Sequence, residues 1–360
     1  MRVSRAAVRR VRLEFRHPVH TARGVATVRD TVLFALTDAE GHTGHGEAAP
    51  WPGFGTEDVD SAQAALEDVA ALVAGLDLEP DAASPAIDAR LRGAPAARAA
   101  LEGALWDLAS RRAGEPLARS LARAVQPGGP GALDAVATHA LLGGDTPGAV
   151  RKSAAAARAA GYRAAKIKLG LGTIDEDVSR ARAAREALGP QLRLRGDANG
   201  AWDAHAAADA LERLSPFGFE FVEQPLPAQA LDALAGLRRR APVRIALDES
   251  VATGPEALRA VEAGAADVLV LKPAFLGGPR RALEVAARAR AAGVEVVFTH
   301  AMESAVGAHV ALHCAAVAAD PAAIHGLGTA GLFAEDVAAP VDAVRGMVRV
   351  PVSPGLGVMP

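Results

Sequence analysis

The first part of the chain combines strand and helix patterns. Residues 7–15 and 31–38 have strand patterns, and the first run alternates apolar and polar positions with a period of two, as half-exposed strands do. In the first run, Val11, Leu13 and Phe15 alternate with arginine and glutamate. A turn-rich stretch follows at 41–55, and helical patterns cover about 57–75 and 98–122. These patterns predict an α+β domain over residues 1–130.

The pattern changes after about residue 133. Short apolar runs now alternate with Ala/Arg-rich amphipathic helices, which is typical of a parallel sheet with crossover helices. The strand candidates are residues 134–142, 164–170, 192–197, 219–224, 243–249, 268–272, 294–300 and 323–328. Charged residues at their ends recur at steps of 24 to 29 residues (272 − 248 = 24; 197 − 168 = 29).

This spacing predicts a β/α barrel over residues 131–335. No G-x-G-x-x-G or phosphate-loop pattern follows a strand, which argues against a nucleotide-binding sheet. The remaining segment, 336–360, contains the strand-like run R-G-M-V-R-V-P. We expect this segment to return as a strand to the N-terminal domain.

Composition narrows the class of protein. The 360 residues carry a net charge of −3 and are 50% hydrophobic, which describes a folded, soluble protein without a basic surface for nucleic acid. No apolar segment follows the basic N-terminus, and no run approaches the ~18 residues of a membrane span. The single cysteine, Cys314, excludes an internal disulfide and fits a reducing compartment. The expected location is the cytoplasm.

Lysine is rare and is concentrated where strands should end. Of 39 basic residues only four are lysine, so 39 − 4 = 35 are arginine, and Lys166, Lys168 and Lys272 each close an apolar run. Arginine is effectively never deprotonated, whereas a desolvated lysine can act as a base. Lys166 and Lys168 are two apart on one strand, so both should enter the barrel mouth. A neighbouring ammonium and a divalent cation both lower a lysine pKa, so we expect one to be the base and the other to stay charged. Lys272 should face the opposite side of a bound substrate.

Three carboxylates close the three strands between these lysines. Asp197, Glu223 and Asp248 end consecutive strand candidates, and the carboxyl ends of barrel strands meet at one face. Three neighbouring carboxylates would take up protons unless a cation neutralised them. Oxygen ligands without His or Cys indicate Mg²⁺ first and Mn²⁺ second. Asn199 and Glu249, just beyond the ligands, are expected to support the site from its edge.

A cation flanked by two lysine sites suits removal of a proton next to a carboxylate. The cation would hold the carboxylate and stabilise the charge that develops, while a lysine takes the proton from carbon. A Schiff-base aldolase would also need a strand-end lysine, but it needs no carboxylate triad, and borohydride trapping would reveal it. A non-catalytic barrel that only binds ligands is the other class, and it would be expected to have lost part of this set.

The same residues resemble the enolase superfamily, in its muconate-lactonizing subgroup. The matching segments are K-I-K at 166–168, RGDANGAW at 195–202, FVEQPL at 221–226, ALDES at 246–250, LKPAFLGG at 271–278 and LEGALWDLASRRAGEPLA at 101–118. The resemblance implies an α+β capping domain over a (β/α)7β modified TIM barrel. It also implies one Mg²⁺ on Asp197, Glu223 and Asp248, and acid/base lysines at Lys168 and Lys272. The mandelate-racemase subgroup has a His–Asp dyad on later strands, and Lys272 at the sixth strand disfavours it here.

Within the subgroup, three segments most resemble o-succinylbenzoate synthases: HGEAAPWPGF (45–54), THAMESAVG (299–307) and HGLGTAGLF (325–333). The implied reaction is a syn elimination of water from 2-succinyl-6-hydroxy-2,4-cyclohexadiene-1-carboxylate for menaquinone synthesis. Racemisation of N-succinylamino acids, dipeptide epimerisation and muconate-type cycloisomerisation stay open as alternatives. Dipeptide epimerases usually carry D-x-D on the eighth strand, where this chain has G-L-G at 326–328. His300, where many relatives have a small residue, departs from the pattern.

Specificity should come from loops above the barrel. Thr21 and Arg23 are placed to meet a substrate carboxylate, and Trp51 and Phe54 to form an apolar wall. The segment after the seventh strand adds candidates for substrate contact: His300, Glu303 and Ser304. The expected partner is a small-molecule carboxylate, with neither nucleic acid nor membrane, and a homo-oligomer is left open.

Overall fold

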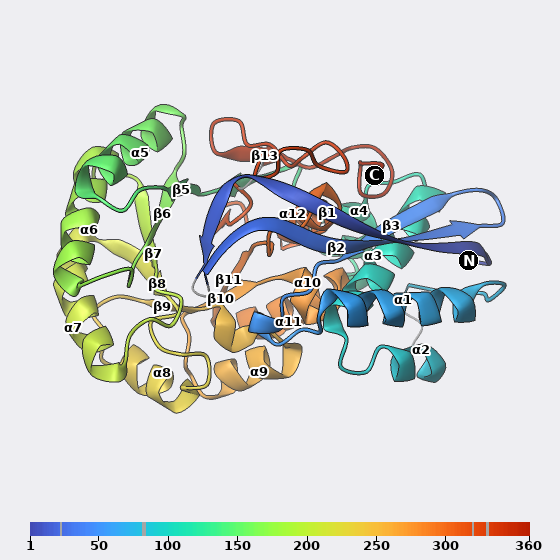
Figure 1. Cartoon of the computed structure of the whole chain (residues 1–360), viewed down its shortest axis with the longest axis horizontal. Helices are drawn as coiled ribbons and strands as arrows, with labels where there is room; N and C mark the ends of the chain where they lie inside the picture. Colours follow the sequence, from blue (N-terminus) through green and yellow to red (C-terminus); the bar gives the residue numbers. More distant parts are fainter. Residues whose placement is uncertain (22–23, 81–83, 319, 329–330) are drawn as a thin grey trace.

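The computed structural model of the protein describes residues 1–21, 24–80, 84–318, 320–328 and 331–360. A capping domain lies beside and over a barrel (Figure 1). The capping domain contains an antiparallel sheet in the order β1-β2-β3, followed by helices. Its elements are β1 (Val3–Thr21), β2 (Gly24–Asp38), β3 (Thr43–Ala48), a 3₁₀ turn (Pro52–Phe54), α1 (Val59–Val73), α2 (Pro85–Arg90), α3 (Pro95–Arg112) and α4 (Leu117–Val125).

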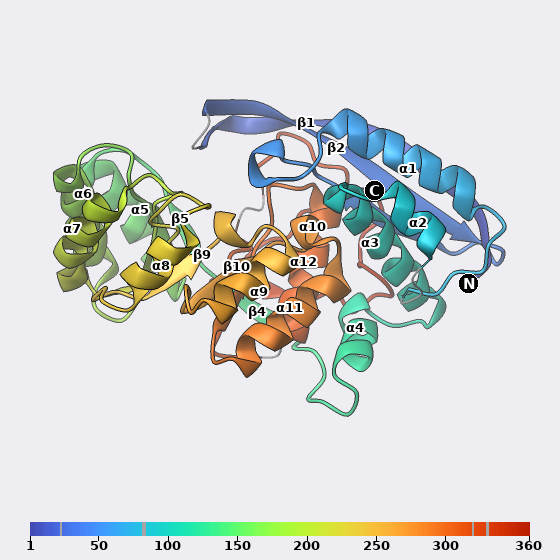
Figure 2. The same ribbon diagram turned by 90° about the horizontal axis from the view of Figure 1, so that it is seen from below.

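Strands β1 and β2 form a hairpin that is longer than the two predicted strands. They pair from Val3 opposite Asp38 to Thr21 opposite Gly24. In Figures 1 and 2 the hairpin extends from the capping helices across the barrel. There the ring of Phe15 stacks on that of Phe333, with centroids 5.0 Å apart. The hairpin therefore reaches the loop that follows the last barrel strand.

Strand β3 was predicted as part of a turn-rich stretch, and its glycines explain the difference. A Cβ at Gly44 would lie 2.2 Å from the carbonyl oxygen of Ala104, and one at Gly46 would lie 1.9 Å from that of Ala100. Helix α3 thus packs directly on the strand backbone, which only glycine permits. The apolar alternation that marks other strands is absent from β3, because glycines stand at the positions that face α3, where other strands have apolar side chains.

The barrel contains a seven-stranded parallel sheet in the order β11-β10-β9-β8-β7-β6-β5. Its strands are β5 (Ala140–Leu142), β6 (Ala164–Lys168), β7 (Arg193–Asp197), β8 (Phe219–Glu223), β9 (Ile245–Leu247), β10 (Val268–Leu271) and β11 (Glu295–Phe298). The helices that surround it are α5 (Pro147–Ala159), α6 (Ile174–Leu188), α7 (Ala204–Leu214), α8 (Leu231–Arg238), α9 (Gly254–Glu262), α10 (Pro273–Leu276), α11 (Pro279–Ala291) and α12 (Ala305–Val317). Two 3₁₀ turns cover Ser215–Phe217 and Glu249–Val251.

Two short strands join the edges of this sheet. The run predicted as one strand at 134–142 is divided at His139 into β4 (Ala135–Thr138) and β5. Strand β12 (Ile324–His325) pairs in parallel with β4, and a bridge between Thr299 and Gly326 attaches it to the end of β11. The predicted (β/α)7β barrel with an α+β capping domain is thereby confirmed.

The C-terminal segment connects the barrel to the capping helices. Its strand, β13 (Met347–Arg349), pairs antiparallel with β4, and not with the capping sheet as expected. Further on, the backbone of Leu117 donates to the carbonyl of Gly355 at 2.8 Å, and Leu356 donates to Asp107 at 2.7 Å. Strand β13 therefore pairs with the barrel, at the edge of β4. The residues after β13 make the contacts with the capping domain.

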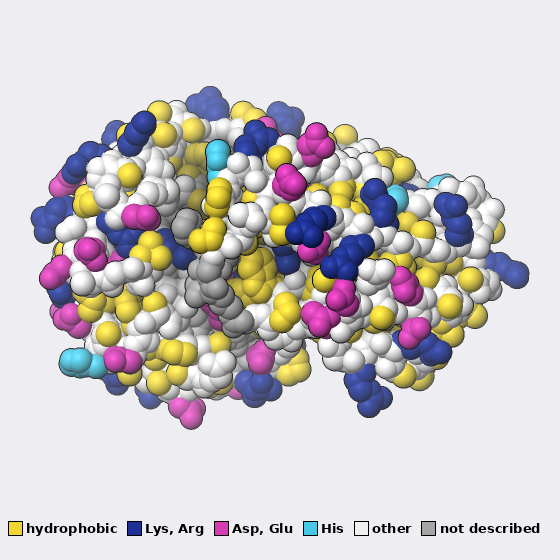
Figure 3. Space-filling view, viewed as in Figure 1, with side chains coloured by type: hydrophobic (Ala, Val, Ile, Leu, Met, Phe, Trp, Pro, Cys, Tyr) yellow, Lys and Arg dark blue, Asp and Glu magenta, His cyan; other side chains and the backbone are white. Residues whose placement is uncertain are grey.

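Acidic and basic side chains are interspersed on the face shown in Figure 3, as the small net charge suggests. Within the described ranges, no helix is long and apolar enough to cross a membrane.

Glu102 of α3 caps a barrel helix. Its carboxylate accepts from the backbone of Arg280 at 2.8 Å and of Arg281 at 3.4 Å, in the first turn of α11. A carboxylate at a helix N-terminus satisfies amide groups that have no partner within the helix. Burial nevertheless raises the pKa of Glu102 to about 7, against the lowering effect of those bonds and of the two arginines.

This pKa makes stability depend on pH. Because the folded-state pKa exceeds the ordinary 4.5, the contribution of Glu102 is fully present below pH 4.5 and is lost as pH rises to about 7. The loss is at most about 3 kcal/mol, from ~1.4 kcal/mol per pKa unit. We expect the free energy of urea unfolding of wild type, relative to that of Glu102→Gln, to fall between about pH 5 and about pH 8. The exposed Glu212→Gln should track wild type at both values, and parallel curves for Glu102→Gln would contradict the prediction.

Candidate active site

Barrel strands bring the predicted ionisable residues to one end. In the sheet register, Lys168 of β6 lies opposite Asp197 of β7, and Asp197 lies opposite Glu223 of β8. Asp248 directly follows β9 and Lys272 directly follows β10. All three carboxylates and Lys272 are buried. The structure therefore places together the residues that the sequence singled out on five consecutive strands.

Lys166 binds two of the carboxylates. Its ammonium lies 2.9 Å from Asp197 Oδ2 and 3.1 Å from Glu223 Oε1. Burial alone would lower the pKa of Lys166, but the negative charges of Asp197 and Glu223 outweigh it and raise the pKa above its ordinary value. Lys166 is thus held in the charged form.

Lys168 has different surroundings. Within the described part of the chain, no carboxylate lies within 4.0 Å of its ammonium, and its side chain is only half-buried. Its backbone carbonyl accepts from Arg180 at 2.9 Å, which fixes the strand end without engaging the amine. The side chain can therefore meet a substrate without first breaking an ion pair.

Lys272 is held by a carboxylate and two aromatic rings. Its ammonium donates to Asp248 and lies 4.8 Å from the ring centroid of Phe54 and 5.8 Å from that of Phe275. Burial lowers the pKa of Lys272, but Asp248 and Glu249 outweigh it and the net shift is upward. Ring faces also favour a cation. Phe54 belongs to the capping domain, so the site is built from both domains.

The carboxylates suit a hard cation in their donor chemistry. Burial raises the pKa of Glu223 against the lowering effect of Lys166, and the charges of Asp197 and Asp248 add to the rise. Asn199 donates to Glu249 Oε1 at 2.9 Å, which leaves Asn199 Oδ1 and Glu249 Oε2 as buried oxygens without a hydrogen-bond partner. Buried oxygens of this kind normally have a partner, and a cation is one. The donor oxygens of the three carboxylates do not all lie within 4.8 Å of one another, and in this structure Lys166 and Lys272 bind them.

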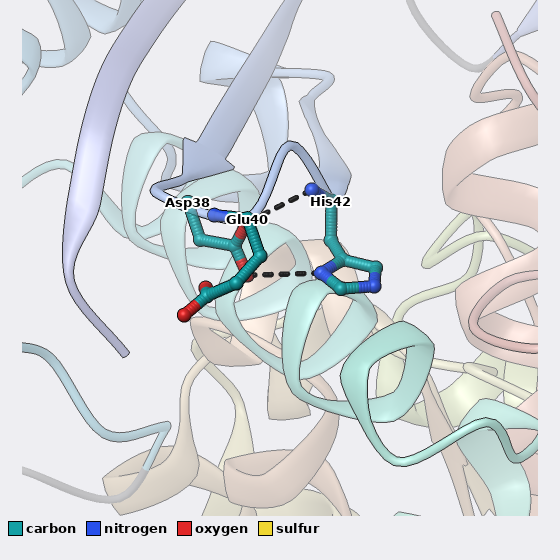
Figure 4. A group of neighbouring side chains, drawn as sticks. All are labelled: Asp38, Glu40 and His42. Carbon is teal, nitrogen blue, oxygen red and sulfur yellow. Dashed lines mark hydrogen bonds and ion pairs between the residues drawn. The ribbon is translucent and has the colours of Figure 1, made fainter.

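A group that meets this spacing among the described residues is Asp38, Glu40 and His42, in the turn between β2 and β3 (Figure 4). Asp38 already accepts from the backbone of Glu40 at 3.0 Å, the backbone of His42 at 2.8 Å and the side chain of Arg112 at 2.7 Å. The group is explained as a turn stabilised by Arg112, and the predicted metal residues remain the carboxylates at the barrel strand ends.

The predicted apolar wall lies beside Lys272. Trp51 and Phe54 pack against a cluster of Ala274, Phe275 and Ala301. The Trp51 and Phe54 rings meet edge to face at 6.1 Å, and Phe54 lies 5.4 Å from Phe275. The wall therefore connects the capping loop that contains Trp51 and Phe54 with the segments that follow β10 and β11.

The other predicted contact residues have mixed placements. His300 pairs with Glu303 at 3.3 Å, and both are buried at the end of the seventh strand. Ser304 caps α12 and donates to Glu47, which gives its side chain a structural partner. Arg23 lies outside the described residues, and of Thr21 only the backbone at the end of β1 is described.

Sequence reasoning missed two buried charged residues, Arg29 and Glu47. Glu47 accepts from the backbone of Ser304 at 3.0 Å and of Gly307 at 2.9 Å. Burial raises its pKa above the ordinary value. Arg29 donates to several backbone carbonyls between the domains. Glu47 lay within a segment predicted as a turn, and nothing in one sequence distinguishes Arg29 from 34 other arginines (35 − 1).

This combination of fold and site defines a class of barrel proteins with lysines around strand-end carboxylates. Residues 149–360 match the family described as enolase C-terminal domain-like, and residues 4–121 match the mandelate racemase / muconate lactonizing enzyme N-terminal domain. The chain belongs to this family, in the muconate-lactonizing subgroup of the enolase superfamily.

Relatives of several activities resemble the chain. Muconate cycloisomerase 1 of Rhodococcus opacus is 34% identical over 92% of this chain and 89% of its own length. The o-succinylbenzoate synthase of Mycobacterium tuberculosis is 45% identical over 201 residues, which is 54% of this chain and 58% of that protein. The solved dipeptide epimerase of Enterococcus faecalis, complexed with Mg and L-Leu-L-Tyr, has a TM-score of 0.90 at 26% identity and covers 100% of both chains. The chain is accordingly a racemase-, epimerase-, cycloisomerase- or o-succinylbenzoate synthase-like enzyme.

Proposed function

We propose that the protein is an o-succinylbenzoate synthase, which removes a proton next to a carboxylate and then expels a hydroxyl group. The observation that carries this choice is the packing of the eighth strand. A Cβ at Gly326 would lie 2.7 Å from Thr299 Oγ1, and one at Gly328 would lie 2.5 Å from the carbonyl oxygen of His139. The D-x-D pair expected of a dipeptide epimerase therefore has no room here.

Two further observations support this activity. Identity to the mycobacterial synthase is 45% where the two chains align, against 34% to the cycloisomerase over a longer span. Lys272 is held between Asp248 and two aromatic rings, an environment that suits a fixed positive charge beside a ring-shaped substrate.

Asp197, Glu223 and Asp248 would hold Mg²⁺, as the buried unpartnered oxygens of Asn199 and Glu249 beside them suggest. Mg²⁺ bound there would fix the substrate carboxylate and offset the charge that develops as the proton leaves. Lys166 and Lys272 bind these carboxylates in this structure, so Mg²⁺ would share the site with both ammonium groups.

The lysines divide the work. Lys168 takes the proton from the carbon next to the carboxylate, and the electron pair of that C–H bond forms the new double bond as the C–O bond breaks. Lys168 then returns the proton to the departing hydroxyl, which leaves as water, so atoms and charge balance. Lys166 and Lys272 remain charged on either side. Phe54 and Trp51 would form an apolar wall beside the substrate ring.

The experiment that tests this assignment is turnover of 2-succinyl-6-hydroxy-2,4-cyclohexadiene-1-carboxylate against a panel of N-succinyl amino acids, dipeptides and muconate. Dehydration of the cyclohexadiene alone is the expected result. Deuterium exchange on an N-succinyl amino acid from both faces, without dehydration, would replace the synthase by a racemase.

Replacement of Lys272 by arginine separates one-base from two-base chemistry. A synthase needs only positive charge at this position, so Lys272→Arg should retain measurable dehydration, reduced by about tenfold because the larger group crowds the ring. A racemase needs a lysine that gives and takes a proton, so the same change would stop racemisation while Lys168 still exchanges one face. Stopped-assay product analysis and deuterium incorporation distinguish the two.

Racemisation of N-succinylamino acids remains the second candidate, because it uses the same lysines and does not require the eighth-strand carboxylates.

A further inference from the structure

Arg29 of β2 lies at the junction of the two domains. Its guanidinium donates to the carbonyl oxygens of Ala49 and Pro50, both at 2.7 Å, in the loop that leads from β3 to Trp51 and Phe54. It also donates to the carbonyls of Ala301 and Met302 at 3.4 Å, in the loop after the seventh barrel strand. One side chain thus binds backbone from both domains.

The guanidinium also stacks on Trp51 of the apolar wall. Its central carbon is 4.6 Å from the ring centroid of Trp51, and the side chain is 8% exposed. Trp51 meets Phe54 edge to face, and Phe54 in turn covers the ammonium of Lys272. The chain of contacts from Arg29 through Trp51 and Phe54 to Lys272 is continuous.

We propose that Arg29 is a positioning residue that holds the capping-domain rings over Lys272. It does so through the geometry of its planar fork, which can meet carbonyls on two loops at once. Lysine offers one compact charge and cannot reproduce that geometry. The loop that contains Trp51 and Phe54 is then part of the site of Lys272. Arg29, at the domain interface, sets the position of this loop.

The importance of Lys272 rests on the proposed function, but the test does not require turnover. The chain has only four lysines, so acetylation by acetic anhydride, mapped by peptide mass spectrometry, reports each of them. Lys152 on α5 is exposed and serves as the internal reference, whereas Lys272 is 9% exposed. The experiment uses the whole 360-residue chain with Mg²⁺ present.

We expect Phe54→Leu to raise the acetylation rate of Lys272 about threefold or more, because the covering ring is lost. Arg29→Lys should raise it by a similar factor, and the double variant should equal Phe54→Leu alone, since both act through the same ring. The matched control is Arg111→Lys, which alters a capping-domain arginine bonded to Asp107 and Val358 and should leave Lys272 unchanged.

A wild-type rate for Lys272 in Arg29→Lys, or effects that multiply in the double variant, would overturn the proposal. Circular dichroism and thermal melting show whether each variant folds. If Arg29→Lys does not fold, Trp51→Leu decides, because it leaves the four carbonyl bonds in place and removes the link to Phe54. An unchanged Lys272 rate in Trp51→Leu would equally overturn the proposal. A protein that fails to dehydrate the cyclohexadiene yet shows this pattern would refute the synthase and leave the role of Arg29 intact.

Discussion

Replacement of Lys168 by arginine should lower kcat by at least about 10³ while the protein stays folded. Arginine keeps the positive charge but cannot lose its proton at neutral pH, so the variant retains the positive charge of the site and loses the proposed base. The structure sharpens this expectation, because Lys166 is bound to Asp197 and Glu223 whereas Lys168 has no carboxylate within ion-pair distance among the described residues. Steady-state kinetics with the proposed cyclohexadiene substrate measure the effect.

Lys152→Arg is the matched control, since Lys152 is exposed on α5 and should keep wild-type kcat. Near-wild-type turnover in Lys168→Arg would move the base to another residue, with Lys272 next. Loss of folding would be recognised by thermal melting, and it is not expected because the half-buried Lys168 side chain lies at the barrel mouth, outside the packed core.

The second large effect is expected at the carboxylates. Asp248→Asn should abolish measurable turnover, because it removes one proposed oxygen ligand and also the partner of Lys272. Isothermal titration with Mg²⁺ should show weakened binding in the same variant. Asp232→Asn, at an exposed position on α8, is the control and should change neither quantity.

Chelation tests the same site in the unmodified protein. EDTA should remove activity and added Mg²⁺ should restore it, while the protein stays folded because the hydrophobic core does not include the carboxylates. Full activity in metal-free buffer would contradict the metal assignment, whatever the outcome for Asp248→Asn.

The sequence by itself determined the barrel and the composition of its mouth. Parallel strands that are covered on both faces read as short apolar runs, and the ionisable residues at their ends stand out because such groups are costly in a barrel unless they bind something. Lys166, Asp197 and Lys272 could be placed in this way since each strand end is a local feature, and strand order follows from chain order.

Only the tertiary structure decided how these groups are paired and what covers them. The assignment of Lys166 to Asp197 and Glu223, and of Lys272 to Asp248, depends on distances between strands that no local pattern encodes. The same holds for β3, where the glycines have meaning only because α3 lies against them. The role of Arg29 could not be predicted from the sequence for the same physical reason. Its partners are backbone carbonyls, which every residue supplies, and the contact of the two domains brings them together.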